Sequence, residues 1–588
     1  METTKSSFDY LVVGGGSAGC VLANRLSASG VYSVCVLERG SSIAKFPDTA
    51  WIVRHPWSWA FTIIRPNPFA MAFYTTPQKH ANDRKIYCPR GITFGGSGSV
   101  NAACWVRGDP LDYDRWAKED GCTGWTFKDC LPYFKRLETY ESGIRMGADS
   151  LPGGLDEVIK KDKAYAKEIA KYRGSSGPIR TLSGRVVHER YTKPAVGPAI
   201  IRAGMEAGYP YNPDHNGPSF EGISWFDTNV RAGTRDNTGQ AYLEPANERS
   251  NLQKIESALV RRVLFEQKGK EIKAIGVEYQ DLESGEIKSV FVRQEVILCA
   301  GAYNSPQILL LSGVGDSEHL KEMGIQTIHH LPGVGRNLQD HPCLIMSSES
   351  TKTECGFPIG DWSDSNEYVN KVRAEWNSTR TGKAGSNQLE VVLFARTSPS
   401  LPYANMQVHF VSTFRLAGEG GDVNLVSGVS AIPTVLRPKS VGFLKLQSNK
   451  PEDLPVIDPN MLENDEDVEE LLEGVLMVRK IFGQPALKDI LGPELVPGSS
   501  VASREQLKKI IRENACLLYH PIGTCRMGDP ARVKDPSQLV VDTSLRVCGI
   551  AGLRVVDASV MPSLPSGNTH QPTLMIAEKA ADLILNVV

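Results

Sequence analysis

The sequence predicts an α/β protein, and two observations support this fold class. The first is a unit of strand, glycine-rich turn, helix and second strand within residues 9–38. The second is the succession of apolar patterns further along the chain. Strand-like patterns occur at 252–265, 273–279, 295–299 and 407–411, and helical spacing occurs at 197–208, 466–482 and 573–588. The last of these helices is expected to be amphipathic.

Composition excludes some classes of protein. The 588 residues contain 65 Lys and Arg against 67 Asp and Glu, a net charge of −2, so the basic excess of a nucleic-acid-binding protein is missing. No apolar run reaches the roughly 18 residues of a membrane span, and we see no secretory signal or C-terminal peroxisomal tripeptide. We therefore expect a cytoplasmic protein. Twelve cysteines occur without metal-like CxxC spacing, and no metal site is expected.

The glycine turn has the spacing of a dinucleotide-binding motif. Gly14, Gly16 and Gly19 form GxGxxG, in which the glycines permit a tight turn, close approach to a pyrophosphate and close helix packing. Ser17 and Ala18 complete the turn, where the helix N-terminus offers N–H donors to phosphate. Glu38 ends the second strand, where a carboxylate accepts hydrogen bonds from a ribose diol. An acid at this place disfavours NADP.

Six separate stretches resemble the glucose–methanol–choline (GMC) family of flavin oxidoreductases, and the resemblance covers nearly the whole chain. They are Asp9–Gly40, Arg90–Asn101, Gly301–Gly315, Leu331–His341, His520–Gly528 and Val556–Ser559. The resemblance implies a Rossmann-like FAD-binding domain and a substrate-binding domain on an antiparallel sheet. Residues 1–335 would be mainly FAD-binding, with the family's N-terminal module at about 8–318. Residues 336–514 would bind substrate, and 515–588 would return to the FAD domain.

The resemblance also implies which further residues hold FAD. They are Gly95, Gly96, Asn101 and Ala102 near the pyrophosphate and flavin, Val260 at the adenine, Asp557 and Ala558 at the ribityl and pyrophosphate, and Pro572 and Thr573 at the start of the last helix. The dipole of that helix would face the negative locus of reduced flavin. Val100 occupies the place where some relatives carry a flavin-linking His, so FAD is predicted to be non-covalent.

His520 and His570 are the candidate catalytic residues, because both lie in glycine- and proline-framed turns beside family motifs. Oxidation of an alcohol requires removal of the hydroxyl proton as hydride leaves carbon for flavin N5. An imidazole suits this step, with an unperturbed pKa near ~6.5. We expect His520 to be the general base and His570 to orient the hydroxyl. His341 is expected to pack near the cofactor and Cys525 to be a buried packing thiol.

The predicted function is FAD-dependent oxidation of a small alcohol to an aldehyde or ketone, with O2 or another acceptor reoxidising the flavin. One alternative is a lyase resembling the plant hydroxynitrile lyases, which also place two histidines near FAD. A second is a fatty acid photodecarboxylase, although that branch of the family has Asn at the position of His520. A third is a scaffold that has lost catalysis, which the intact His pair disfavours. The aromatic-rich stretch 51–76 could form a lid or simply cover the cofactor.

Overall fold

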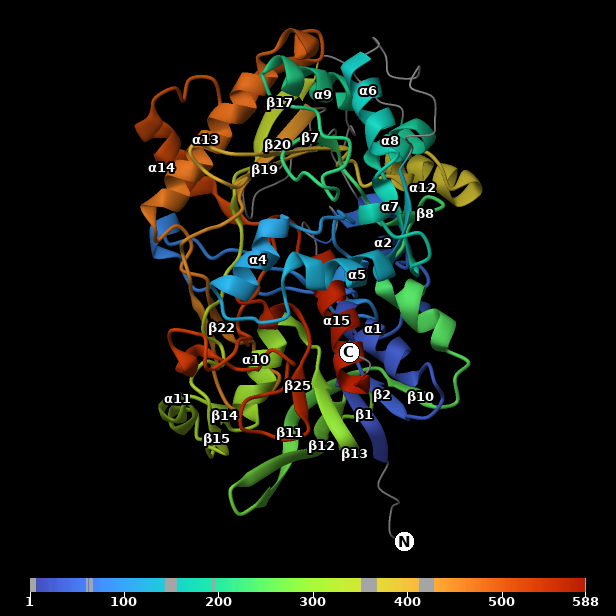
Figure 1. The fold of residues 1–588 in the computed structure, drawn as a ribbon, viewed down its shortest axis with the longest axis vertical. Helices are drawn as coiled ribbons and strands as arrows, with labels where there is room; N and C mark the ends of the chain where they lie inside the picture. The colour runs from blue at the N-terminus through green and yellow to red at the C-terminus, as the bar shows by residue number, and fades with distance from the viewer. Residues whose placement is uncertain are drawn as a thin grey trace.

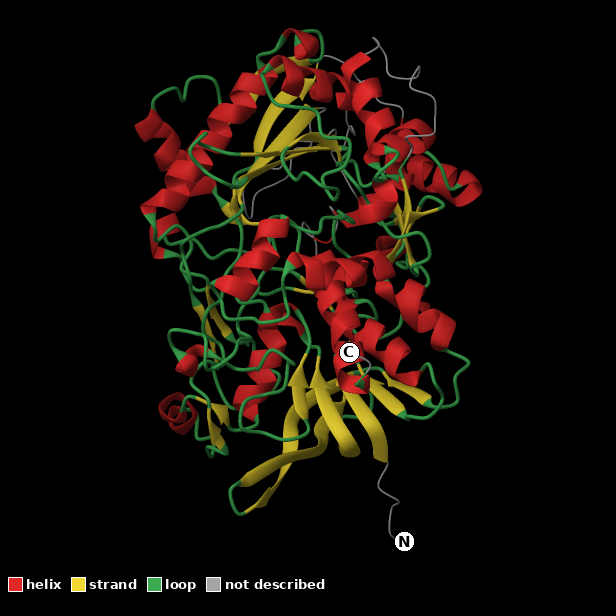
Figure 2. Cartoon of the chain, viewed as in Figure 1, coloured by secondary structure: helices red, strands yellow, loops and turns green. Residues whose placement is uncertain are grey.

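Two sheets organise the chain (Figures 1 and 2). The computed structural model describes residues 7–59, 62, 67–142, 156–192, 196–350, 367–411 and 428–586. Its α-helices are α1 Ser17–Ser27, α2 Trp51–Arg54, α4 Pro110–Lys118, α5 Phe127–Leu137, α6 Asp156–Tyr165, α7 Ile169–Tyr172, α8 Gly184–Val187, α9 Val196–Glu206, α10 Gly301–Leu311, α11 Ser317–Glu322, α12 Glu367–Thr379, α13 Asp465–Phe482, α14 Arg504–Asn514 and α15 His570–Leu585. In the described part of the chain, no helix combines the length and apolar character needed to cross a membrane.

The first sheet joins distant parts of the sequence. Its order is β10–β2–β1–β13–β12–β11, and β25 also pairs with β13. The strands are β1 Ser7–Val13, β2 Val34–Leu37, β10 Leu252–Ile255, β11 Ala258–Lys268, β12 Glu271–Asp281, β13 Ile287–Leu298 and β25 Leu553–Val555. The pairs from β10 to β13 and β25 are parallel, whereas β11, β12 and β13 form an antiparallel meander. The predicted α/β class and its dinucleotide-binding unit are therefore confirmed.

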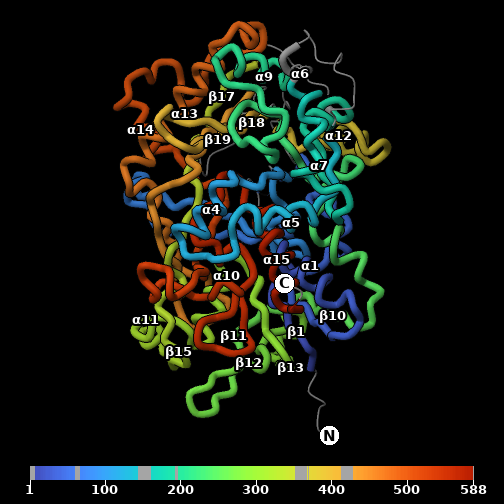
Figure 3. The backbone as a smooth tube through the Cα atoms, viewed as in Figure 1, coloured from blue at the N-terminus to red at the C-terminus, as the bar shows by residue number. Residues whose placement is uncertain are grey.

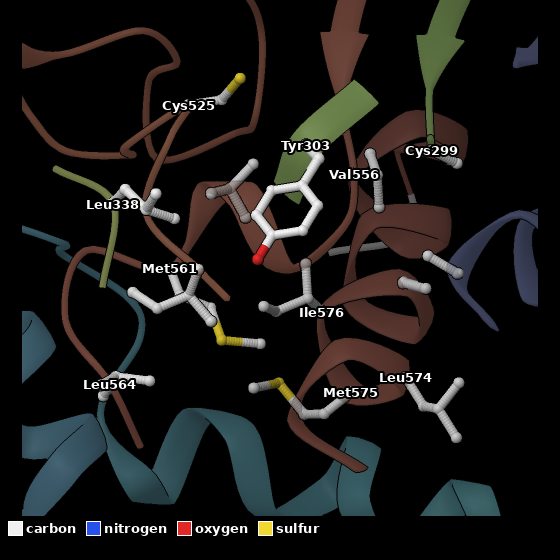
Figure 4. Close-up of a cluster of buried hydrophobic side chains, with 14 of the residues drawn as sticks. Cys299, Tyr303, Leu338, Cys525, Val556, Met561, Leu564, Leu574, Met575 and Ile576 are labelled. Atoms are coloured by element: carbon white, nitrogen blue, oxygen red, sulfur yellow. The ribbon is translucent and has the colours of Figure 1, made fainter. Parts of the chain in front are cut away.

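Helices from the two ends of the chain meet beside this sheet. The first helix, α1, lies next to α15, near the C-terminus in Figure 3, and Arg25 pairs with the fully buried Glu578 at 2.7 Å. The prediction that the last helix is amphipathic is wrong, because every residue from Gln571 to Ala581 is buried. Figure 4 shows why: Leu574, Met575 and Ile576 project from the helix in different directions within a buried apolar cluster.

The second sheet is antiparallel and lies at the other end of the molecule (Figure 1). Its order is β23–β17–β20–β19–β18–β7, and the short strands β16 and β24 attach at β20. The strands are β7 Gly222–Trp225, β16 Pro342–Cys343, β17 Met346–Ser350, β18 Val391–Ala395, β19 Met406–Val411, β20 Gly428–Val435, β23 Leu491–Val496 and β24 Cys516–Leu517. Helix α13 packs on β19 and β20. It begins with the acidic residues Asp465, Glu466 and Asp467 and has Arg479 and Lys480 in its last turn, which suits the helix dipole.

Short elements complete the fold around these sheets. Two-stranded pairs are β3 Ala70–Met71 with β4 Arg90–Gly91, β5 Glu138–Glu141 with β6 Ile179–Leu182, β8 Val230–Arg231 with β9 Thr234–Arg235, β14 Val314–Gly315 with β15 His329–His330, and β21 Phe443–Lys445 with β22 Val456–Asp458. In the aromatic-rich stretch, residues 60, 61 and 63–66 lie outside the described residues. Trp57 and Trp59 are buried in an apolar cluster, so this part of the stretch packs inside the protein.

Candidate active site

One large cavity of about 1190 Å³ reaches from the first sheet to the second. The first sheet contributes the turn after β1, the end of β2 and the start of β11. The second sheet contributes Cys343, Ile432 and Cys516. This volume exceeds the range of about 300–1,000 Å³ that is typical of small-molecule pockets. The cavity therefore has room for a dinucleotide and a second, smaller molecule.

The glycines of the first turn are required by close backbone contacts. Gly14 has φ +100°, and a Cβ there would lie 2.6 Å from the carbonyl oxygen of Cys299. A Cβ on Gly19 would lie only 1.9 Å from the carbonyl oxygen of Gly14. By contrast, a Cβ on Gly16 would meet nothing closer than 3.8 Å, because this residue faces the cavity at the N-terminus of α1. The turn thus presents bare backbone to a ligand, as a pyrophosphate requires.

Glu38 lies where the sequence predicts, at the end of β2 in the cavity wall. Its Oε2 accepts a hydrogen bond from the backbone N–H of Gly15, and its Oε1 accepts one from Gly40, both at 2.8 Å. Burial raises the pKa of this carboxyl to about 7. Each carboxylate oxygen has a further lone pair available for a ribose hydroxyl.

Most of the predicted cofactor residues line this one cavity. They are Gly14, Gly16, Ser17, Ala18, Glu38, Gly96, Asn101, Ala102, Val260, Asp557, Ala558 and Thr573. Gly19, Gly95 and Pro572 do not line it. Gly19 packs against Gly14, and Gly95 donates its N–H to the carbonyl of Gly15 at 2.8 Å. Pro572 is buried in the first turn of α15, which begins three residues before the predicted helix at 573–588.

A buried guanidinium holds Asn101. Arg235 donates to the side-chain oxygen of Asn101 at 2.8 Å and to the carbonyl of Val53 at 3.1 Å. Its Nη2 has no hydrogen-bond partner among the described residues, and burial lowers its pKa to about 9. The arrangement places a positive charge directly behind the cavity wall.

Asp557 is held rigidly between two segments. Its Oδ2 accepts hydrogen bonds from the N–H of Gly301 at 2.9 Å and from the hydroxyl of Ser305 at 2.6 Å. Its Oδ1 accepts one from the N–H of Ser559 at 2.8 Å. Burial raises the pKa of this carboxyl above its usual value. Asp557 thereby ties the loop after β25 to the N-terminus of α10.

His520 belongs to a chain of hydrogen bonds that assigns its tautomer. Nε2 of His341 lies 3.1 Å from the carbonyl oxygen of Leu436, which can only accept, so this nitrogen carries the proton. Nδ1 of a neutral His341 is then an acceptor, and it lies 3.0 Å from Nδ1 of His520. His520 is therefore protonated on Nδ1, and its Nε2 is unprotonated. The amide of Asn568 donates to that Nε2 at 3.1 Å.

The backbone around His520 is fixed by a carboxylate and a left-handed residue. Oδ1 of Asp340 accepts hydrogen bonds from the N–H groups of both His341 and His520, each at 2.8 Å. Tyr519 has φ +65°, a conformation that is uncommon for a non-glycine residue. The guanidinium of Arg90 donates to its carbonyl at 2.6 Å. These contacts hold the imidazole of His520 at the cavity.

His570 also lines the cavity, at the first position of α15. His570 is partly buried, its ring lies edge-on to Trp105 with 6.0 Å between the ring centroids, and neither of its two buried ring nitrogens has a hydrogen-bond partner among the described residues. Gly98 leaves the space for this ring, because a Cβ there would lie 2.7 Å from Nε2 of His570. Two unpaired nitrogens in a cavity wall are available to a bound ligand.

Burial keeps these histidines neutral. It lowers the pKa of His570 to about 4 and that of His341 to about 3. The pKa of His520 is lowered well below its usual value, first by burial and then by the neighbouring His341, His409 and Arg90. At neutral pH the free nitrogen of His520 is therefore able to accept a proton.

The cavity beyond His520 is largely apolar. Side chains from an apolar cluster line it here, and they are Trp59, Ala102, Cys104, Cys343, Ile345, Leu389, Ile432, Cys516 and Leu518. We call this part the substrate chamber. Cys525 lies outside it, buried in the core of Figure 4, and burial raises the pKa of its thiol well above the usual value. It is a packing residue, as predicted.

The residues present fit FAD. The glycine turn and Glu38 form a cradle for an adenosine diphosphate group, and the bare backbone at Gly16 fits its pyrophosphate. Asn101, Asp557 and Thr573 line the same cavity further along. The unpaired ring nitrogens of His570 mark the place where a reacting group can be held.

Sequence reasoning missed three residues of the site. Asp340 lies within a recognised motif and Asn568 lies in the turn before His570, but nothing in their spacing shows that they contact His520. Arg235 lies outside all the motifs, and a buried guanidinium leaves no signal in the sequence. Only the predicted proximity of His341 to the cofactor pointed toward this network.

The comparisons with known proteins agree with this site. Models of the N- and C-terminal parts of the GMC oxidoreductases match residues 8–343 and 438–577. Mitochondrial choline dehydrogenase of Homo sapiens is 37% identical over 99% of this chain and 90% of its own length. The oxygen-dependent choline dehydrogenase of Vibrio vulnificus is 36% identical over 98% and 94%.

Two solved structures are similar over nearly the whole chain. Pyridoxine 4-oxidase from Mesorbium loti has a TM-score of 0.79 and 26% identity, and the match covers 97% of this chain and 98% of that one. A formate oxidase of Aspergillus oryzae has a TM-score of 0.84 and 25% identity, with 100% and 99% covered. The chain therefore belongs to the GMC oxidoreductase family of FAD-dependent enzymes.

Proposed function

We propose that the chain oxidises a primary or secondary alcohol to an aldehyde or ketone, with His520 as general base. The observation that supports this most directly is the hydrogen-bond chain from Leu436 through His341. It leaves Nε2 of His520 unprotonated, and the hydrogen bond that this nitrogen accepts from Asn568 is the one that a substrate hydroxyl would replace. A base must have its lone pair available at the pH of the reaction, and burial provides this by lowering the pKa of His520.

In the proposed step, Nε2 of His520 takes the hydroxyl proton as the C–H bond breaks. FAD, when bound, supplies the hydride acceptor. The single N–H of the neutral His570 ring can donate to the hydroxyl oxygen, because neither ring nitrogen has a partner within the described protein. Nδ1 of His520 keeps its own proton throughout and donates a hydrogen bond to Nδ1 of His341. The buried positive charge of Arg235 favours the negative charge that two-electron reduction brings to the site.

The test is anaerobic reduction of the flavin by a panel of alcohols, followed by admission of air. We expect His520→Ala to bind FAD as the wild type does and to lose at least ~100-fold in reduction rate, the lower end of the range for general-base catalysis. Full flavin reduction by this variant would refute the assignment. Rapid reoxidation in air would identify O2 as the acceptor, and slow reoxidation would identify a dehydrogenase.

For the substrate, we propose a neutral alcohol with an apolar body. Choline is the necessary comparison, because the relatives carry its name. Apolar side chains make up most of this part of the cavity, the imidazole of His409 lies beside Ile432 in the same wall, and the nearby charges of Arg90 and Arg235 are positive. We therefore expect the neutral carbon isostere of choline, in which carbon replaces nitrogen, to reduce the flavin at least as fast as choline. Faster reduction by choline would refute this substrate class.

We also propose that FAD is held without a covalent bond. Val100 lies in the cavity wall and offers no nucleophile to the flavin. Denatured protein should therefore release its FAD, and a protein mass increased by one FAD would contradict the proposal.

Measurements of the flavin and of released CO2 separate the alternative functions. A lyase would leave the flavin oxidised with every alcohol, and a photodecarboxylase would release CO2 from a fatty acid under blue light.

A further inference from the structure

Two cysteines face each other across the strands that lead from the catalytic histidine network. Cys343 on β16 and Cys516 on β24 are register partners in an antiparallel pair, and their Sγ atoms lie 3.5 Å apart. Directly opposite residues in such pairs have Cα atoms about 4.5–5.5 Å apart. A disulfide needs a Cα separation of about 4.4–6.8 Å, so the backbone already has the required geometry.

The pair is accessible from the cavity, since both residues line it. Cys343 is 1% exposed, whereas Cys516 is only partly buried. The two strands also adjoin the histidine network: β16 begins directly after His341, and β24 ends three residues before His520. Any cross-link between the sulfurs would therefore join the two segments that carry these rings.

We propose that Cys343 and Cys516 are a site of reversible oxidative modification, at which hydrogen peroxide converts the two thiols to a disulfide. None of the described cysteines forms a disulfide in this structure, so the pair is shown in its reduced state.

The reaction balances with one peroxide. The Cys516 sulfur attacks one peroxide oxygen, an S–O bond forms as the O–O bond breaks, and the departing oxygen leaves as water. The Cys343 sulfur then attacks the sulfenic sulfur, an S–S bond forms as the S–O bond breaks, and a second water leaves with the remaining thiol proton. Two thiols are oxidised by two electrons in total, and one peroxide is reduced to two waters.

The roles of the two sulfurs follow from their surroundings. The hydrogen bond with Cys516 and burial raise the pKa of Cys343 well above its usual value, so Cys343 holds its proton. That assigns the attack on peroxide to Cys516, which is also the more exposed residue. Cys343 then resolves the sulfenic acid at short range. The disulfide closes a loop between residues 173 apart in sequence, and cross-links of this kind stabilise the folded state.

The experiment exposes the FAD-loaded protein to hydrogen peroxide, alkylates the remaining thiols after denaturation and maps the peptides. We expect a Cys343–Cys516 disulfide, a higher Tm and reversal of both by dithiothreitol. Wild-type protein suffices for this test, so it does not depend on the folding of a variant. Complete alkylation of both cysteines, or irreversible sulfinic acid at Cys516, would overturn the proposal.

Single variants test the order of attack. Cys343→Ser should accumulate a sulfenic acid at Cys516 that a dimedone probe traps, while Cys516→Ser should show no labelling at Cys343. Cys548→Ser, a half-buried thiol outside the cavity wall, is the matched control and should form the disulfide as the wild type does. Strong labelling of Cys343 in the Cys516→Ser variant would refute the assigned order.

A second arm replaces added peroxide with aerobic turnover, and only this arm rests on the proposed function, with O2 as acceptor. Disulfide formation during turnover that catalase prevents would identify the enzyme's own product as the oxidant. If added peroxide forms the disulfide and turnover does not, the modification site stands and only its proposed source is refuted.

Discussion

Replacement of His341 by Leu tests the hydrogen-bond chain that assigns the tautomer of His520. The variant removes the acceptor for Nδ1–H of His520, which is at 3.0 Å from His341, and leaves that donor buried. An unsatisfied buried donor costs about 1–3 kcal/mol. His520 can avoid this cost by moving its proton to Nε2, the nitrogen that the reaction needs free.

The expected effect follows from that cost. If all of it appears in the barrier to flavin reduction, the rate falls by about 5-fold to about 160-fold, since each 1.36 kcal/mol is a factor of ten. The assay is stopped-flow flavin reduction without oxygen at saturating alcohol. His341→Gln is the informative partner, because its amide can accept from His520 and donate to the Leu436 carbonyl. It should recover most of the rate.

Two further measurements distinguish positioning from general damage. Both variants should keep wild-type FAD content, and replacement of the exposed His330 on β15 by Leu should leave the rate of flavin reduction normal. The acid limb of the pH profile should also move in His341→Leu, because His341 is one of the groups that lower the pKa of His520. Wild-type reduction by His341→Leu, or equal losses in the Leu and Gln variants, would refute the reasoning.

The remaining predictions concern the glycines and pH. Gly19→Ala places a Cβ 1.9 Å from the Gly14 carbonyl and should lower both FAD content and stability, by about 1–3 kcal/mol, in thermal and flavin assays; full FAD occupancy would contradict this. Gly98→Ala should displace His570 and lower kcat/KM on the order of 10-fold with FAD retained, whereas unchanged kinetics would exclude the contact. Because only neutral His520 can act as base and its pKa is lowered, flavin reduction should stay constant as pH falls to about 6.5; an inflection above that value would be inconsistent. The free energy of unfolding should also fall as the pH falls. The neutral form of His570 stabilises the fold fully above the unfolded pKa of about 6.5, and this contribution is lost as the pH approaches the folded pKa of about 4. Denaturant titrations should therefore show a loss of about 2 kcal/mol from this residue between pH 7 and pH 5. His570→Asn should lose less stability over this interval, and an equal loss would contradict the account.

Local patterns predicted the dinucleotide-binding unit and the helices α9, α13 and α15, but not the other α-helices outside that unit. The turn at Gly14–Gly19 is recognisable from its spacing alone, although only the Gly19–Gly14 contact lies within the unit and Gly14 also packs against the distant Cys299. The same local logic failed for the last helix, which it predicted to be amphipathic and which contains the polar residues Glu578 and Lys579. In the structure both are buried, and Glu578 pairs with Arg25 from the other end of the chain. Partners so distant in sequence leave no periodic signal.

The sequence by itself determined the FAD-binding turn, the family and the two candidate catalytic histidines, because each depends on residues that are neighbours along the chain. Only the tertiary structure decided which nitrogen of His520 is free, since that depends on Leu436 and His341, which belong to other segments. It also decided that Arg235 supports Asn101 and that Cys343 faces Cys516. Hydrogen bonds and sulfur contacts between distant segments form only when the two atoms are placed to within a few tenths of an ångström, and only the folded chain fixes their positions to that precision.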